Sequence, residues 1–362
     1  MESNYHITRA QLFFVIVQTQ IGIGILSLPH DLHKVAKGDS WISIIIAGLG
    51  VQLSIFILYF ICKRFPDLNF YEFTPKIVGK WIGGFINSIY VIYFIFIIGL
   101  ITVLWTSILK EWVYYQTPKW MFYLIVAFIL LYFASQTLRV IARFDMFVSV
   151  FLVVLIALIV YSFGDIDFRY LFPIGQSGVK DIISGANQAL VAMLGFDVLL
   201  FVFPLVKAES RQILKTMTYA NIFVTSYYLF VILVALVTFA PEELNKIPEP
   251  VLYMLKALAL TVIERVDLLF LSIWIVSVAT SITSYGYLAS KGLSYFFRKP
   301  HNRMISFVAV SVFIIAFIPQ NPSHIDLYSQ IMSYISYLYV MIIPFTLLII
   351  AIIKKKLGES SK

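Results

Sequence analysis

Long apolar runs separated by short polar segments extend along the whole chain, and this pattern predicts membrane-spanning helices. A helix that crosses the hydrocarbon core of a bilayer needs about 20 consecutive, mostly apolar residues. The pattern predicts ten spans, of which the ninth is short and the eighth and tenth carry polar residues. The expected spans are 10–36, 41–62, 82–109, 121–138, 144–163, 182–206, 217–240, 267–292, 304–318 and 328–353.

The composition excludes an ordinary soluble domain. Of the 362 residues, 60% are hydrophobic and 13% are charged, whereas soluble domains are about half apolar and about a quarter charged. Because the excess apolar surface has to face lipid, we expect an all-α membrane protein with one transmembrane domain over residues 1–362. Cys62 is the only cysteine, which excludes an intrachain disulfide and a cysteine-based zinc site.

The basic residues predict the orientation of the helices. A net charge of +8 could indicate a nucleic-acid partner, but the Lys and Arg residues are scattered in small groups between the apolar runs. That distribution is typical of residues that set membrane topology. If both termini are cytoplasmic, 18 of the 27 basic residues fall on the cytoplasmic side. We therefore expect cytoplasmic termini and no nucleic-acid partner.

The first span and one outer loop carry further features. The first span lacks a basic leader and a small-residue cleavage site, and it contains Gln18 and Gln20, so we expect a retained helix. In the loop before the eighth span, apolar residues recur at helical spacing over residues 248–265. This spacing predicts a helix on the outer face, either an inert interfacial helix or the cover of an entrance.

Two spans contain residues that interrupt a helix. The first carries Gly22-Ile23-Gly24-Ile25 followed by Pro29, and the sixth carries Gly195-Phe196-Asp197 followed by Pro204. Glycine loosens the backbone and proline removes a donor from the helix ladder. Each interruption alone could be a simple kink. Unpaired backbone at membrane depth is tolerated only beside protein or a cavity, so the pair predicts a binding site.

The spacing of the two interruptions predicts an internal repeat. Pro204 follows Pro29 by 175 residues, which is nearly half of the chain. The breaks therefore occupy matching positions in two five-helix halves, residues 1–163 and 182–353. Because five is odd, the second half enters the membrane from the opposite side. We expect a 5+5 inverted repeat with broken helices one and six and with the ligand between the halves.

Asp197 is the strongest single candidate for a ligand contact. Every other acidic residue maps to a loop, a terminus or the end of an expected span. An ionisable group within a span costs several kcal/mol unless it meets water, a partner or a helix amino terminus. Asp197 is either a contact to a ligand cation, a proton carrier, or a structural cap of the second half-helix. Freed amides near Gly22, Ile23, Gly24 and Ile25 would suit a carboxylate, so the two breaks offer both poles of an amino acid.

Further polar residues on other spans are candidates for the same cavity. Tyr93 lies on the third span, and Thr280 and Ser284 lie within a polar cluster on the eighth. We expect ligand contacts from these three together with Gly195 and Phe196. In membranes, Ser and Thr more often join helices, so packing is the alternative role. The cluster on the eighth span would hold either a sodium ion or water.

Nothing in the sequence predicts an enzyme or a cofactor. His30 and His33 lie three residues apart near a helix end, but no third ligand follows them, so we expect no metal site. Nucleophile motifs, phosphate-binding loops and paired carboxylates within the spans are missing from the sequence.

Several segments resemble the spore germination permease family, and the resemblance covers essentially the whole chain. They are Gly22-Ile23-Gly24-Ile25 with Leu28-Pro29, the run from Gly195 to Phe201 with Pro204, Ile263-Glu264-Arg265 with Leu271 and Trp274, and Tyr285-Gly286-Tyr287. Members of this family are the B subunits of nutrient germinant receptors. The resemblance implies the leucine-transporter-like fold of amino acid–polyamine–organocation transporters.

The resemblance also implies a place and a role. It implies the inner membrane of a bacterial endospore, or a cell membrane, with an A subunit and a lipoprotein C subunit as partners. By analogy, Gly22, Gly24, Gly195 and Asp197 correspond to the unwound segments that hold substrate. Proton-coupled relatives carry a lysine on the fifth span, and residues 144–163 contain none. We therefore expect a receptor subunit that binds a small nutrient, with a secondary transporter of amino acids or amines as the alternative.

Overall fold

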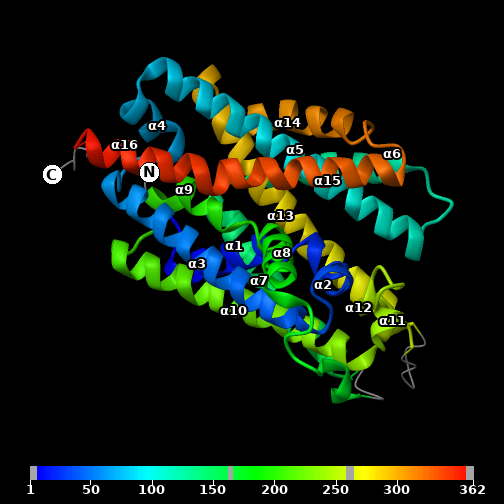
Figure 1. The fold of residues 1–362 in the computed structure, drawn as a ribbon. Helices are drawn as coiled ribbons and strands as arrows, with labels where there is room; N and C mark the ends of the chain where they lie inside the picture. Colours follow the sequence, from blue (N-terminus) through cyan, green and yellow to red (C-terminus); the bar gives the residue numbers. More distant parts are fainter. Residues whose placement is uncertain (1–5, 162–165, 258–264, 356–362) are drawn as a thin grey trace.

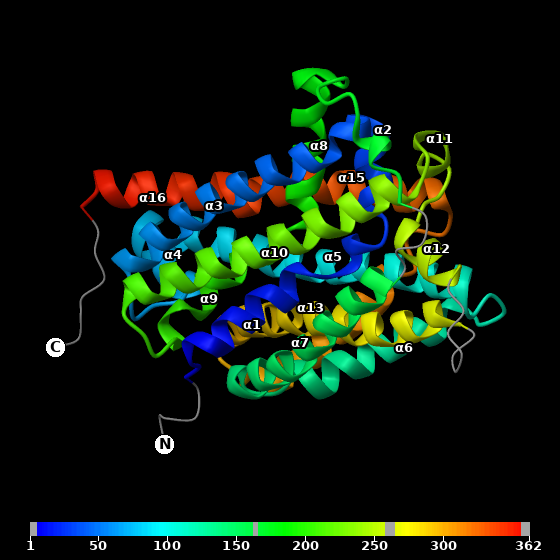
Figure 2. The same ribbon diagram turned by 90° about the horizontal axis from the view of Figure 1, so that it is seen from below.

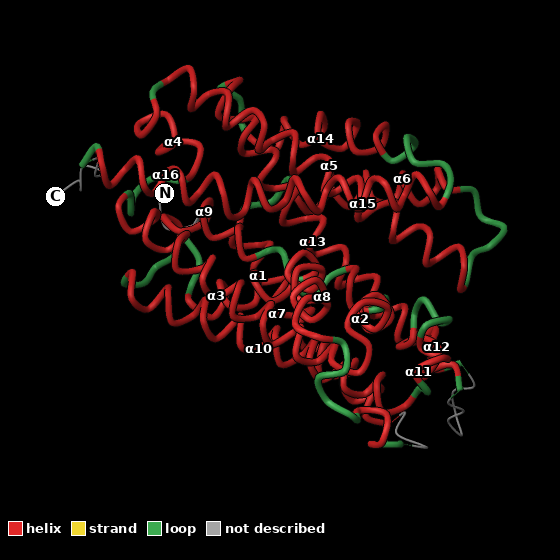
Figure 3. The backbone as a smooth tube through the Cα atoms, viewed as in Figure 1, coloured by secondary structure: helices red, strands yellow, loops and turns green. Residues whose placement is uncertain are grey.

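The computed structural model describes residues 6–161, 166–257 and 265–355, and these residues are almost entirely helical (Figure 3). Within those ranges the only β-pairing is a bridge between Ile7 and Val206. The first half contains α1 (Arg9–Gln20), α2 (Leu28–Ala36), α3 (Ser40–Arg64), α4 (Phe70–Val78), α5 (Lys80–Trp112), α6 (Lys119–Ile129) and α7 (Leu138–Tyr161). The second half contains α8 (Gly178–Ala192), α9 (Leu199–Val202), α10 (Ser210–Thr238), α11 (Pro241–Leu244), α12 (Pro250–Lys256), α13 (Val266–Phe297), α14 (His301–Ile315), α15 (Pro322–Tyr337) and α16 (Ile343–Ile353).

Short tighter or wider helical turns connect several of these elements. The 3₁₀ turns are η2 (Ile23–Ile25), η3 (Lys37–Asp39), η5 (Phe168–Leu171), η6 (Phe196–Val198) and η7 (Phe203–Leu205), and the π-turns are η4 (Leu130–Ala134) and η8 (Leu338–Ile342). The turns η2 and η6 replace regular helix at the two expected interruptions.

The helices form an elongated bundle with two distinct ends (Figures 1 and 2). The start of α1, the end of α16, α4 and α9 lie at one end, which we call the near end. The elements α2, α11 and α12 lie at the other, which we call the far end. In the middle of the bundle, α1 packs against α7, α10 and α13.

The length and composition of the helices agree with a multi-pass membrane protein. Six segments of the described chain are long and apolar enough to cross a membrane, and a seventh is the bent pair Gly178–Ala192 and Phe196–Leu205, whose axes differ by 52°. Two further apolar helices, Lys119–Ala134 and His301–Ile315, are shorter.

The two interrupted segments are joined to each other at both ends of the bundle. At the near end, the Ile7 amide donates to Leu205 O (2.8 Å) and the Lys207 amide donates to Ile7 O (2.9 Å). At the far end, the buried Asp39 carboxylate accepts from the amides of Gly175 (2.7 Å) and Ser177 (3.0 Å), just before α8. Hydrogen bonds therefore connect the segment around α1 and α2 to the segment around α8 and α9.

The structure differs from the expected spans in three places. The fifth span begins at Leu138, six residues early, and this places Asp145 inside α7. The statement that Asp197 alone among the acidic residues lies within a span is therefore wrong. The outer helix expected over residues 248–265 is present as α12 from Pro250 to Lys256, while residues 258–264 lie outside the described part. The short helices α4 and α11 were not expected.

Candidate functional site

The first interruption begins where α1 ends. The Ile21 amide donates to Val17 O, which completes the last turn of α1. Gly22 then takes an irregular conformation (φ −121°, ψ −131°), one 3₁₀ turn follows, and α2 begins with Pro29 in its first turn. Proline is tolerated there because the first turn of a helix has no amide partner within the helix. The expected break of helix one is thus present at Gly22 to Ile25.

Side chains from two other helices bond to the carbonyl groups that the break releases. Ser281 Oγ of α13 donates to Gln18 O (3.0 Å), and the Tyr228 hydroxyl of α10 donates to Gln20 O (3.1 Å). Trp274 Nε1 of α13 lies 3.4 Å from Gly22 O. Buried carbonyls without partners cost about 1–3 kcal/mol each. These three donors therefore stabilise the interrupted conformation.

The second interruption contacts the first directly. The structure ends α8 at Ala192, and Gly195 adopts φ +130°, a conformation that favours glycine. A Cβ on Gly195 would lie 2.8 Å from the Gln20 amide nitrogen, so the two backbones touch at this point. Gln20 also donates through Nε2 to Met193 O (2.7 Å). Only glycine permits this approach at the junction of the two breaks.

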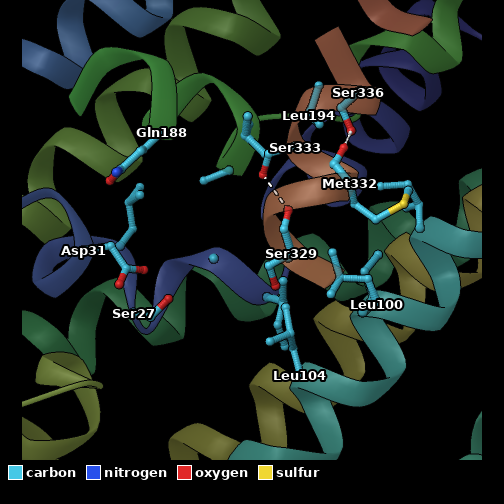
Figure 4. Close-up of a pocket in the computed structure, with 18 of the residues that line it drawn as sticks. Ser27, Asp31, Leu100, Leu104, Gln188, Leu194, Ser329, Met332, Ser333 and Ser336 are labelled. Carbon is cyan, nitrogen blue, oxygen red and sulfur yellow. Dashed lines mark hydrogen bonds between the residues drawn. The ribbon is translucent and has the colours of Figure 1, made fainter. Parts of the chain in front are cut away.

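A cavity of about 820 Å³ leads from this junction toward the far end (Figure 4). Its lining comes from both breaks, from α2, α5, α8 and α13, and from α15. Polar lining residues include Gln20, Ser27, Asp31, Gln188, Ser329 and Ser333, and apolar ones include Ile23, Leu100, Leu104, Val191, Leu194 and Met332. Figure 4 shows Asp31 and Gln188 on one side of the space, opposite the serines of α15.

An acidic group lies beside the far end of this cavity. Glu249, just before α12, is largely buried. Burial, and next the negative charge of Glu111, raise the pKa of Glu249 to about 7. The charge of Asp31, which lines the cavity, adds to this increase.

Three of the expected ligand residues line the cavity, namely Gly22, Ile23 and Gly24. Ile25, Gly195 and Phe196 are buried beside it rather than in its wall. Tyr93 is also buried, where its hydroxyl donates to Ser336 Oγ (3.1 Å).

Asp197 is enclosed at the junction, with 1% of its surface exposed. Its Oδ1 accepts from the Gly195 amide (3.2 Å), and its Oδ2 has no hydrogen-bond partner in the described chain. The Tyr285 side chain, which lines the cavity, neighbours this carboxylate. The aspartate therefore bonds to the Gly195 amide and lies behind a cavity-lining tyrosine.

The polar cluster of α13 contacts a glutamine that the sequence analysis did not assign to the site. Gln18 Oε1 accepts from Ser277 (2.9 Å) and lies 3.2 Å from Thr280 Oγ1, while its Nε2 donates to Ser149 of α7 (3.0 Å). Ser284 is buried in a separate small space, and its hydroxyl has no partner in the described part. The polar character of Gln18 and Gln20 within an apolar span was the signal that could have identified both.

The two histidines of α2 bond to the end of α11: His30 to its last residue and His33 to the residue that follows it. His30 Nδ1 lies 2.8 Å from Leu244 O, and His33 Nδ1 lies 3.0 Å from Asn245 Oδ1. Groups of three or more potential metal-binding side chains do not occur in the described ranges. The histidines therefore connect α2 to the far-end segment around α11.

A family model described as spore germination protein matches residues 6–325. The chain belongs to this family. Spore germination protein GerQB of Bacillus cereus is 25% identical over 338 residues, 93% of either chain. Spore germination protein A2 of Bacillus subtilis (strain 168) is 26% identical over 350 residues, 95% of this chain and 94% of the relative. The family resemblance seen in the sequence is confirmed.

A solved structure shares the fold of this spore germination protein. The crystal structure of MhsT in complex with L-phenylalanine superimposes with a TM-score of 0.67 over 97% of this chain and 92% of MhsT, at 14% identity. At this identity the likeness shows the fold alone. It confirms an all-helical membrane protein with the leucine-transporter-like fold.

Proposed function

We propose that this chain is the membrane subunit of a spore nutrient germinant receptor and that it binds a small nutrient, an amino acid, where its two broken helices meet. The observation that carries the proposal is the cavity of about 820 Å³ that reaches both interruptions in a member of the spore germination family. Its opening toward the far end gives the ligand a path that the contacts at the near end do not offer.

The chemistry at the junction supports a zwitterionic ligand. Ser281, Tyr228 and Trp274 direct their donors to carbonyl oxygens of the first break. The amide groups at the start of η2 and α2 therefore suit an anionic group such as a carboxylate, because helix amino ends attract anions. Gln20 Oε1 and Asp197 Oδ2 are buried acceptors without donors in the described chain, and both suit an ammonium group.

The proposal includes the topology and the partners expected from the sequence. It takes ten spans in a 5+5 inverted repeat, with cytoplasmic termini, so that the far end faces away from the cytoplasm. Partner A and C subunits would receive the signal. A ligand shifts a conformational equilibrium only by binding one state more tightly than the other. The proposal therefore requires that the ligand favours one arrangement of the two broken helices.

A thermal-shift screen of the purified chain against single amino acids, sugars and nucleosides tests this function. We expect amino acids to raise the melting temperature and the other classes to leave it unchanged. Asp197→Asn should weaken the binding of the responding amino acid about tenfold or more, because a charged partner of the ammonium group is lost. Unchanged affinity in a folded Asp197→Asn protein would remove Asp197 from the proposal.

The second candidate function is secondary transport of amino acids or related amines by alternating access. The fold likeness to MhsT favours it. Purified chain in proteoliposomes separates the two functions. Saturable, gradient-driven uptake of the bound amino acid would support transport, whereas binding without uptake, together with a requirement for partner subunits in germination, would support the receptor.

A further inference from the structure

A buried carboxyl group lies on α7, away from the large cavity. Asp145 is 0% exposed, and neither of its carboxyl oxygens has a hydrogen-bond partner among the described residues. It does not line the large cavity. A buried polar group without partners costs free energy, so its presence inside a membrane helix requires an explanation.

The neighbours of Asp145 on its own helix define its position. Residues Ile141, Asp145 and Ser149 follow one another at one-turn spacing and therefore share a face of α7. Ser149 accepts from Gln18 Nε2 of α1 (3.0 Å), while Ile141 lines a small cavity of about 10 Å³ together with Ser284. Asp145 thus lies between the Gln18 cluster and this small cavity, on the face of α7 that packs against α1 and α13.

Within the described residues, no basic side chain bonds to the Asp145 carboxyl group. The charged groups on α7 and on the elements that pack against it are Arg9 of α1, Arg139 and Arg143 of α7, Lys256 of α12, and Asp267 and Lys291 of α13. Asp197 lies on η6, which packs against α1 and α13, and the tyrosines on these helices are Tyr161, Tyr253, Tyr285, Tyr287 and Tyr295. None of them forms a hydrogen bond or ion pair with either Asp145 oxygen in the described structure. An ionised carboxylate without partners in such a place is far more costly than the neutral acid.

The small cavity at Ile141, one turn from Asp145 on α7, is also too small for a hydrated or fully coordinated metal ion. The cavity of about 10 Å³ accommodates roughly one water-sized sphere. A sodium ion would need several oxygen ligands, whereas the oxygens without partners near this face are those of Asp145 and Ser284. A proton needs only one carboxyl oxygen and no additional volume.

We propose that Asp145 is a proton-binding site at the contact of α1, α7 and α13. The carboxyl group holds its proton while α1 packs against α7 and α13. When this contact opens to water, the O–H bond breaks, the proton passes to a water molecule, and the carboxylate remains in a hydrated site. Gln18 connects the contact to the first break, so protonation of Asp145 is coupled to the position of α1. This site does not depend on the proposed function.

Infrared spectroscopy of the full chain in lipid nanodiscs tests the protonation state. At neutral pH we expect a band from a buried protonated carboxyl group that shifts when carbon-13-labelled aspartate is incorporated. The band should disappear in Asp145→Asn and remain in Asp197→Asn, which removes the buried carboxyl group of the second break. If Asp145→Asn does not fold, the labelled Asp197→Asn protein is measured instead. The proposal requires that the band of the protonated aspartate persists in that protein.

Two outcomes of this experiment overturn the proposal. A spectrum of labelled Asp197→Asn without a protonated aspartate band would mean that Asp145 is ionised. A band that disappears when sodium replaces potassium in the buffer would mean that the carboxylate binds a metal cation instead.

Thiol accessibility tests the coupling to α1. Val15 of α1 lines the small cavity and is buried, and Val15→Cys in a Cys62→Ala background reports whether the contact opens. Between about pH 6 and about pH 9, modification should rise about tenfold more with Asp145 present than with Asp145→Asn. Ionisation of the thiol affects both proteins alike, so the comparison cancels it. An equal rise in the two proteins would exclude the coupling.

Discussion

Two adjacent tyrosines of α10 make opposite predictions for the same substitution. The Tyr228 hydroxyl lies 3.1 Å from Gln20 O and 3.4 Å from Ala192 O, so it connects the last residues of α1 and α8. The Tyr227 hydroxyl is buried without a partner in the described chain. Tyr228→Phe removes a bond at the junction of the breaks, whereas Tyr227→Phe removes only an unsatisfied polar atom.

The expected magnitudes follow from these contacts. Tyr228→Phe leaves the buried carbonyl of Gln20 without its donor, which costs about 1–3 kcal/mol in the free energy of unfolding. Tyr227→Phe should be neutral or stabilising by up to about 1 kcal/mol, because a buried hydroxyl without a partner is itself unfavourable. Both substitutions remove one hydroxyl group and therefore change the side-chain volume equally. Packing therefore contributes equally to the two changes in the free energy of unfolding. The difference between them should reach about 2 kcal/mol, or about 4 °C in melting temperature.

Cys62 supplies the assay for this comparison. It is the only cysteine and is buried in α3, so a thiol-reactive fluorophore reports unfolding directly. Melting curves of the wild type and both variants in one detergent should place Tyr228→Phe lowest, with Tyr227→Phe at or above the wild type. Equal shifts in the two variants would refute the idea that side-chain donors stabilise the break. A lower melting temperature for Tyr227→Phe than for Tyr228→Phe would refute it as well.

Three further predictions concern other parts of the site. Asp39→Ala should lower the free energy of unfolding by about 3 kcal/mol, since two bonds to a carboxylate are lost, whereas the exposed Asp181→Ala should change the melting curve little. The raised pKa of Glu249, about 7, means that the folded state binds this proton more tightly than the unfolded state. Stability should therefore fall as pH rises from about 4.5 to about 7, and Glu249→Gln should remove that part of the profile. Gly24→Leu should abolish amino acid binding in a ligand titration, because even a Cβ at Gly24 would lie 3.2 Å from Ala192. Gly84→Leu is the control, because a Cβ at Gly84 would meet open space.

The positions of both breaks could be predicted because glycine and proline act locally. Gly22, Gly195 and Pro29 influence only the backbone around them, and their effect does not depend on the packing of distant helices. The distinction between cavity-lining Ile23 and enclosed Asp197 depends on that packing, and the sequence pattern contains no information about it. The multi-pass topology and the family could also be predicted from the sequence. Apolar runs and short motifs are contiguous in the chain and do not depend on packing.

Asp145 was missed because of a helix boundary. Arg139 and Arg143 made the segment before the fifth span look like a polar loop, so Asp145 was assigned to the end of a helix. In the structure both arginines belong to the first turns of α7, with Arg143 exposed and Asp145 on the opposite, buried face. A boundary error of six residues thus concealed a buried acidic group, because basic residues near the start of a span resemble a loop in composition alone.

The contacts around α1 explain how events in the cavity and at Asp145 can affect each other. α1 ends in the break that lines the cavity, and two turns of the same helix earlier it packs against the face of α7 that carries Asp145. Gln18 lies between these places and bonds to Ser149 of α7 and Ser277 of α13. If the proposed ligand moves α1, these bonds lengthen or exchange. Because the carboxyl group is without partners while the bonds are formed, exchange of the bonds and release of the proton favour the same opened arrangement. If both proposals hold, ligand binding and proton binding share one conformational equilibrium, and each has to alter the apparent affinity of the other by the same factor.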